Sequence, residues 1–374
     1  MSRLHDGQRA FFHFGNPFRI ILPKGSNMSL KLRELLFSFE KNLAEKLKKL
    51  KPKNIVDVFS LSWMKLAIDF LSDAHNSIKT LINELQLPVS NWDEKWIDIY
   101  LDSSVKLLDI CIALSSELSR LGQGQLLLQY MLHLLDFSAG DPSSEQLSRA
   151  HSYVQEWIEH VNSKSCKLQS CPAIVGSLQG ILDFPKVKSS KGKVLMRALY
   201  GVRVMTVFIC GIFSVILSGS SKTMVYLHAC DGFFWSEVFS DLQSVVNEEI
   251  TRQFAGGQVV IFNEIKAVER CASRLHNLTN TDSCEKEFVG GTNGVNHKAE
   301  IIAPGKITEV SRQRLQELVD NLADRTKQLG EELDSLSKQV NDFFQIVLVG
   351  RDALLCNLRV SAVTQESDVN NIRL

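Results

Sequence analysis

Proline and signs of β-structure are scarce in this sequence. Only eight of the 374 residues are proline, and no stretch shows the sustained alternation of apolar and polar side chains that marks a strand. Apolar residues make up 44% of the chain and charged residues 22%, a balance typical of folded rather than disordered proteins. These features predict an all-α fold: an elongated multi-helix bundle with a long C-terminal, coiled-coil-like helix.

The sequence also lacks the motifs that carry catalysis and cofactor binding. There is no HExxH, no GxSxG and no glycine-rich dinucleotide fingerprint, and residues 219–223 match only the end of a phosphate-binding loop. The eight cysteines include no CxxC pair, so we expect reduced, structural thiols rather than a zinc site. We therefore predict no enzymatic activity, no catalytic residues, no cofactor and no metal. Nothing in the sequence points to a small-molecule ligand, and we do not expect one.

One segment departs from the overall charge balance of 42 basic and 42 acidic residues. Residues 186–222 contain no acidic side chain and seven basic ones: Lys186, Lys188, Lys191, Lys193, Arg197, Arg203 and Lys222. The basic residues flank an apolar run at 204–217 and not aromatic residues spaced for base stacking, so nucleic-acid binding is not expected. A cationic and apolar patch favours an anionic membrane surface. A membrane is therefore the partner we expect.

The apolar run leaves three interpretations open. A spanning helix needs about 20 apolar residues, and residues 204–221 are uncharged but strongly apolar only as far as 217. The run is therefore a buried core helix, a membrane span, or an interfacial or re-entrant segment. If it spans, its basic N-terminal side should face the cytoplasm. The expected membrane contacts are Lys191, Lys193, Arg197, Arg203, Val204, Phe208, Ile209, Ile212, Phe213 and Ile216.

The strongest periodic pattern lies near the C-terminus, at about residues 307–349. Its apolar seam comprises Leu315, Leu318, Leu322, Leu329, Leu333, Leu336, Val340, Phe343 and Val347. Arg325 stands where a further apolar residue is expected, and the spacing predicts a shift of phase near Leu329. The helix either packs within its own bundle or offers this seam to a protein partner or a second copy.

The predicted organisation has five parts. They are an aromatic and basic arm at 1–28, a helical bundle at 29–278, an Asn/Gly-rich linker at 279–305, the C-terminal helix at 306–360 and a tail at 361–374. The arm has neither a secretory signal nor a clear amphipathic transit peptide; it could dock on the bundle or on a membrane interface. Within the bundle, a helix beginning at Ser90 is expected to end near Gly122, with shorter helices at about 124–137 and 144–163.

Long stretches of this chain resemble the plant BYPASS family. The resemblance is carried by FFHFGNPFR at 11–19, LSWMKLA at 61–67, LPVSNWDEKWIDIYLDSSVKLLDIC at 87–111, KGKVLMRALYGV at 191–202 and FFQIVLVGRDALLCNLRV at 343–360. It implies a non-enzymatic developmental regulator that restrains production of a mobile, root-derived signal, linked to carotenoid-type metabolites, which arrests shoot and leaf growth.

The same resemblance suggests partners and locations. Related branches are similar to proteins that bind an exocyst tethering subunit, so the alternative function is a soluble helical adaptor in vesicle tethering. The expected location is the cytoplasmic side of the endoplasmic reticulum or plasma membrane, with the plastid as the alternative.

Overall fold

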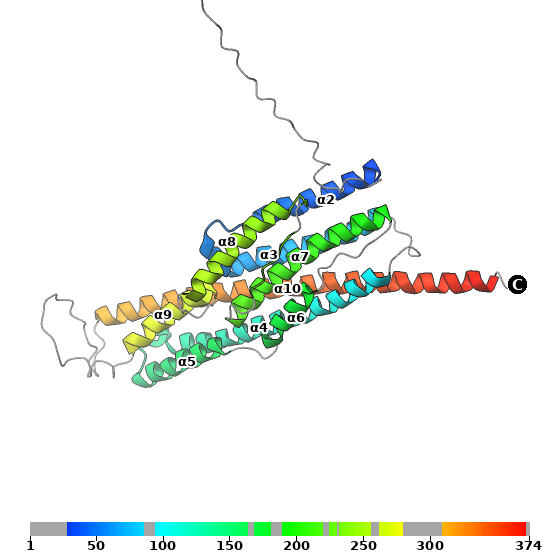
Figure 1. The fold of residues 1–374 in the computed structure, drawn as a ribbon. Coiled ribbons are helices and arrows are strands. Elements are labelled where there is room, and N and C mark those ends of the chain that lie inside the picture. The colour runs from blue at the N-terminus through cyan, green and yellow to red at the C-terminus, as the bar shows by residue number, and fades with distance from the viewer. Residues whose placement is uncertain are drawn as a thin grey trace, which may run out of the picture.

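The protein is described by a computed structural model that covers residues 28–85, 94–163, 168–180, 189–219, 224–229, 232–255, 262–279 and 309–371. All regular secondary structure in these ranges is helical, which confirms the predicted all-α class (Figure 1). The N-terminal arm, except Met28, and the linker, except Thr279, lie outside the described residues.

The helices differ widely in length. They are α2 (Leu30–Lys49), α3 (Leu61–Leu85), α4 (Glu94–Leu134), α5 (Ser144–Asn162), α6 (Cys171–Gln179), α7 (Ser190–Ser218), α8 (Ser236–Ala255), α9 (Asn263–Thr279) and α10 (Glu309–Asn371). Serine side chains cap several of them: Ser29 accepts a hydrogen bond from the Leu32 N–H, and Ser143 forms a capping box with Gln146. Such local bonds satisfy first-turn N–H groups and set where these helices begin.

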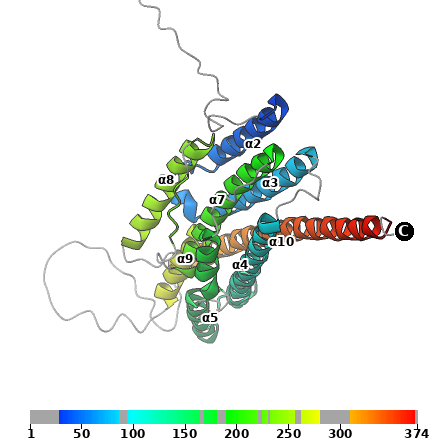
Figure 2. The ribbon, with the colours of Figure 1, turned by 45° about the vertical axis from the view of Figure 1, so that its right-hand side comes forward.

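The long C-terminal helix organises the bundle. α10 packs against α4, α3 and α9, while α7 packs against α3, α6 and α2. Figures 1 and 2 show that the C-terminal part of α10 extends beyond the other helices. α10 continues through Asn371, so the helix includes most of the segment that the sequence suggested as a tail.

The expected end of a helix near Gly122 is wrong. α4 runs without interruption from Glu94 to Leu134. A glycine inside a helix costs about 1 kcal/mol relative to alanine, but burial of neighbours such as Leu121 and Leu128 outweighs this cost. Gly124 instead makes room for α5, because a Cβ atom there would lie 2.8 Å from the ring of His160. Gly124 thus serves helix packing, whereas a Cβ atom at Gly122 would meet no other atom within 4 Å.

Candidate functional site

The apolar run of the basic segment lies inside the protein. Among the described residues, α7 is the one helix long and apolar enough to cross a membrane, yet 89% of its most apolar window is buried within the bundle. The expected membrane contacts on this run are each at most 3% exposed: Val204, Phe208, Ile209, Ile212, Phe213 and Ile216. This placement corresponds to the buried-core interpretation. Contact between these side chains and lipid would require α7 to leave the bundle.

The four basic residues expected at a membrane have different environments. Lys193 is exposed and Lys191 is half-buried, both in the first turn of α7. Arg197 forms an ion pair with Glu40 of α2, and Arg203 lines an internal cavity. Among the described basic residues of this patch, Lys193 at the start of α7 is the exposed one, whereas Lys191, Arg197 and Arg203 are half-buried.

The apolar seam of α10 faces the bundle. Its buried members are Leu315, Leu322, Leu329, Leu333, Leu336, Val340, Phe343 and Val347. Leu318 is only half-buried, and Val319 beside it takes the buried place. The seam thus lies against α4, α3 and α9, the neighbours of α10.

The burial pattern contradicts the phase shift that the sequence predicted near Leu329. Thr326 is 1% exposed, whereas Arg325 is exposed. With Val319 and Thr326 included, buried positions follow alternating steps of four and three from Leu315 to Val347. The Thr326 carbonyl also accepts a 2.7 Å hydrogen bond from the Gln125 side chain of α4. A search for large apolar residues misses threonine, which can occupy a seam position through its methyl group.

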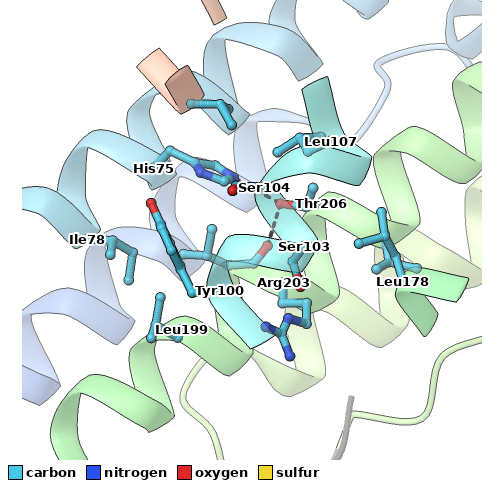
Figure 3. Close-up of a pocket in the computed structure, with 13 residues that line it drawn as sticks. His75, Ile78, Tyr100, Ser103, Ser104, Leu107, Leu178, Leu199, Arg203 and Thr206 are labelled. Atoms are coloured by element: carbon cyan, nitrogen blue, oxygen red, sulfur yellow. Dashed lines mark hydrogen bonds between the residues drawn. The ribbon is translucent and has the colours of Figure 1, made fainter. Parts of the chain in front are cut away.

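The clearest candidate for a binding site is a cavity of about 60 Å³ in the middle of the bundle (Figure 3). α3, α4, α6, α7 and α10 all contribute to its wall. The apolar lining residues are Ile78, Leu107, Leu178, Leu199, Val202, Val207 and Val347. The polar lining residues are His75, Tyr100, Ser103, Ser104, Arg203 and Thr206. A mostly apolar wall with a few convergent polar groups is typical of small-molecule sites.

A second cavity of about 100 Å³ adjoins the first. The two share His75, Ile78 and Tyr100, and the second is otherwise lined by residues of α3 and α10. Gly350 of α10 forms part of this wall, where an added Cβ atom would lie 3.1 Å from the Tyr100 hydroxyl. The Tyr100 side chain therefore lines both cavities.

His75 is held as a neutral imidazole. Its Nε2 lies 3.2 Å from the Thr206 hydroxyl, and that hydroxyl donates its proton to the Val202 carbonyl at 2.8 Å. The hydroxyl must therefore accept from His75, which places the imidazole proton on Nε2. Burial lowers the pKa of His75 to about 4, because the charged form loses its hydration. At neutral pH this side chain is a hydrogen-bond donor and a weak base.

Charged side chains gather at the α4 side of the cavity. Burial lowers the pKa of Arg203, and the negative charge of Asp102 opposes that effect. The Asp102 carboxylate also binds Lys106 at 2.6 Å. From α10, Arg351 donates to the Leu101 carbonyl at 2.6 Å and to the Ser104 hydroxyl at 3.0 Å. Arg203 and Arg351 thus approach the Tyr100–Ser104 segment of α4, beside the ion pair of Asp102 with Lys106.

Sequence reasoning found only Arg203 among these residues, and assigned it to a membrane. His75, Tyr100, Asp102 and Arg351 are isolated polar residues on separate helices, without a spacing that marks a site. One signal was present: Tyr100 and Asp102 lie in the 87–111 stretch that carries the family resemblance, and Arg351 lies in the 343–360 stretch. The fold brings these stretches together.

The described residues offer little reactive chemistry. No group of three His, Cys, Asp or Glu residues among them could hold a metal ion. Burial raises the pKa of Cys111 to about 12 and that of Cys171 to about 11, and raises the pKa of Cys210 well above its usual value. Protonated thiols are poor nucleophiles. None of these three cysteines lines either cavity.

Fold and cavity together define a class of protein: an all-α helical bundle with a small, mostly apolar cavity that Arg203 also lines. Comparison with known proteins goes further. The family model "Protein ROH1-like" matches residues 21–165. "UPF0496 protein 4" of Oryza sativa, subspecies indica, is 44% identical over 456 aligned positions that cover 99% of this chain and 100% of that protein. "Protein BPS1, chloroplastic" of Arabidopsis thaliana is 43% identical, covering 96% of this chain and 93% of that protein.

Similarity at this level along nearly the whole length shows common family. The chain belongs to the BYPASS and ROH1-like family of plant proteins. No solved structure matches it.

Proposed function

We propose that this chain is a non-enzymatic regulator of plant development. It restrains production of a root-derived mobile signal, linked to carotenoid-type metabolites, that otherwise arrests shoot and leaf growth. The observation that carries the proposal is the 43% identity to BPS1 over 96% of the chain, because such similarity covers the whole helical body rather than one exchangeable segment.

Grafting tests the regulatory role directly. Plants that lack this protein and its close copies should arrest shoot growth, and the wild-type chain should restore it. Mutant roots should also arrest a wild-type shoot, whereas wild-type roots should support a mutant shoot. Arrest that follows the genotype of the shoot would contradict a root-derived signal.

We further propose that the protein contacts membranes peripherally, with α7 retained in the bundle. Lys191 and Lys193 in the first turn of α7 supply the positive charge, and lysines near an anionic surface each gain about 1 kcal/mol. The word "chloroplastic" in the name of BPS1 favours a plastid membrane; the cytoplasmic side of the endoplasmic reticulum or plasma membrane is the alternative.

Membrane extraction separates peripheral contact from insertion. High salt should release the full-length protein, because screening removes most of the attraction between exposed charges. Replacing Lys191 and Lys193 with alanine should reduce the membrane fraction, whereas the same change at exposed Lys48 and Lys49 of α2 should not. Resistance to both high salt and alkaline carbonate would instead mean that α7 is inserted.

A second candidate function is a soluble adaptor that binds an exocyst subunit. The match of the ROH1-like family model to residues 21–165 favours it. Because the α10 seam lies inside the bundle, such a partner would need another surface or a released α10. Titration of the full chain with purified exocyst subunits measures the interaction, and absence of binding at micromolar concentrations would remove this function.

A further inference from the structure

We propose that the two adjoining cavities form one binding site for a small apolar carboxylic acid. The carboxylate would lie on the side of Arg203, and the hydrocarbon body would extend past Tyr100 into the second cavity. Figure 3 shows Arg203 and His75 on opposite sides of the first cavity, with aliphatic side chains around them. The proposal concerns binding in vitro and does not depend on the developmental role.

The walls select an apolar body. Aliphatic residues of α3, α4, α6, α7 and α10 form most of the first cavity. Ile82, Ile346 and Leu354 add aliphatic surface to the second, whose wall also includes the polar side chains of Asn76, Lys79 and Asn83. Hydrocarbon transferred from water into such a space gains free energy in proportion to its buried area. A highly charged ligand such as a nucleotide would lose its hydration without enough polar partners.

The charges select an anion. Three basic side chains lie near residues Tyr100–Ser104 of α4: Arg203, Lys106 and Arg351. The Asp102 carboxylate interacts electrostatically with Arg203 and also forms an ion pair with Lys106. A carboxylate brought beside Arg203 would gain Coulomb energy from this guanidinium, whose burial already disfavours its charged form. Arginine presents a planar fork of donors that fits two carboxylate oxygens.

The hydroxyl and imidazole groups are compatible with this ligand. Burial raises the pKa of Tyr100, so its phenol stays protonated and remains a donor. His75 is neutral and already donates to Thr206, and therefore adds no charge at the far side. The cavity sizes of about 60 and 100 Å³ leave room for on the order of ten heavy atoms, at roughly one per 10–15 Å³.

Calorimetric titration of the full chain with decanoate, below its micelle concentration and at neutral pH, tests the proposal. 1-Decanol and decylamine serve as neutral and cationic probes of the same length. Decanoate should bind at least about tenfold more tightly than decanol, and decylamine should bind least, because tenfold is the scale of one good ionic contact. Equal binding of acid and alcohol, or no binding of decanoate by the folded chain, would overturn the proposal.

Two test variants and one control variant locate the ligand. Arg203→Met keeps an apolar side chain but removes the charge, and should weaken decanoate binding at least about tenfold with little effect on decanol. Lys193→Met, on the exposed face of the same helix, should leave both unchanged. Ser103→Leu, which fills the first cavity and leaves all charges in place, should weaken decanoate and decanol alike.

Circular dichroism and the unfolding midpoint show whether each variant is folded. If Arg203→Met does not fold, the folded Ser103→Leu protein decides the question. Unchanged decanoate affinity in either folded variant would place the ligand elsewhere and contradict the proposal.

Discussion

Glu40 of α2 and Arg197 of α7 form an ion pair inside the bundle, with Arg197 Nε 2.5 Å from Glu40 Oε1. The glutamate is fully buried. Its other oxygen accepts a 2.9 Å hydrogen bond from the Phe234 N–H, and Arg197 also donates to the Gly232 carbonyl. The pair therefore joins α2, α7 and the segment before α8. A positive charge that the sequence suggested for a membrane is engaged in the core.

Removing the charge of Glu40 should strongly destabilise the protein. In Glu40→Gln the arginine stays buried without a counter-ion, and breaking a buried pair in this way costs about 3–5 kcal/mol. Glu45→Gln is the matched control, because Glu45 on the same helix is 61% exposed and pairs with Lys41 at 3.8 Å; it should cost less than about 1 kcal/mol. Urea unfolding measures both. Equal losses would show that Arg197 is adequately solvated without Glu40.

Truncating α7 in its apolar centre should destabilise the protein in aqueous buffer without detergent. Phe213 is 0% exposed, and Phe213→Ala should cost about 3–5 kcal/mol through lost transfer energy and a cavity. Phe234 is 40% exposed and has an edge contact with Phe37, so Phe234→Ala should cost about 1 kcal/mol. Guanidinium unfolding gives both values. A Phe213→Ala protein as stable as wild type would indicate that α7 does not belong to the core.

Replacing Thr326 with valine should stabilise the protein. The Thr326 hydroxyl is buried and has no hydrogen-bond partner among the described residues, and such a group costs about 1–3 kcal/mol. Valine has nearly the same shape and leaves the bond from Gln125 to the backbone carbonyl intact. We expect a gain of about 1 kcal/mol in the free energy of unfolding.

Arg325→Ala is the control for this seam position. Arg325 is exposed, so its replacement should change stability by less than about 0.5 kcal/mol. If instead Arg325→Ala stabilised the protein and Thr326→Val did not, the seam would have the phase shift that the sequence suggested.

Acid should weaken the fold partly through His75. Its pKa falls from 6.5 in the unfolded chain to about 4 in the folded protein, so below pH 6.5 the unfolded state binds more protons. The stability that neutral His75 provides is complete above pH 6.5 and is lost as the pH falls towards 4, by about 2–3 kcal/mol.

Comparison of wild type with His75→Gln isolates this effect. His276 also has a lowered pKa from burial and from His151 and contributes in the same direction in both proteins. Urea unfolding between pH 7 and 4.5 should therefore show a shallower loss for His75→Gln than for wild type. Parallel curves would mean that His75 is accessible to water and titrates normally.

Local patterns were sufficient for much of the helical architecture. The spacing of leucines in α2 and α10 predicts amphipathic helices, and both are present in the structure. Local rules failed at Gly122, because a glycine weakens a helix by only about 1 kcal/mol and packing on both sides of it restores more. They also failed at Thr326, whose burial depends on its neighbours in other helices.

The sequence by itself determined the all-α class, the family and the unusual charge of the segment around α7. Each of these follows from composition, periodicity or extended similarity, which need no knowledge of what lies beside a helix. Only the tertiary structure decided that α7 is enclosed by protein, that Arg197 has Glu40 as its partner, and that Arg203 meets Tyr100 at a cavity. The physical reason is that an apolar helix gains free energy from leaving water in either a core or a bilayer. Its hydrophobicity does not distinguish the two, whereas the faces of α2, α3 and α6 that surround it do.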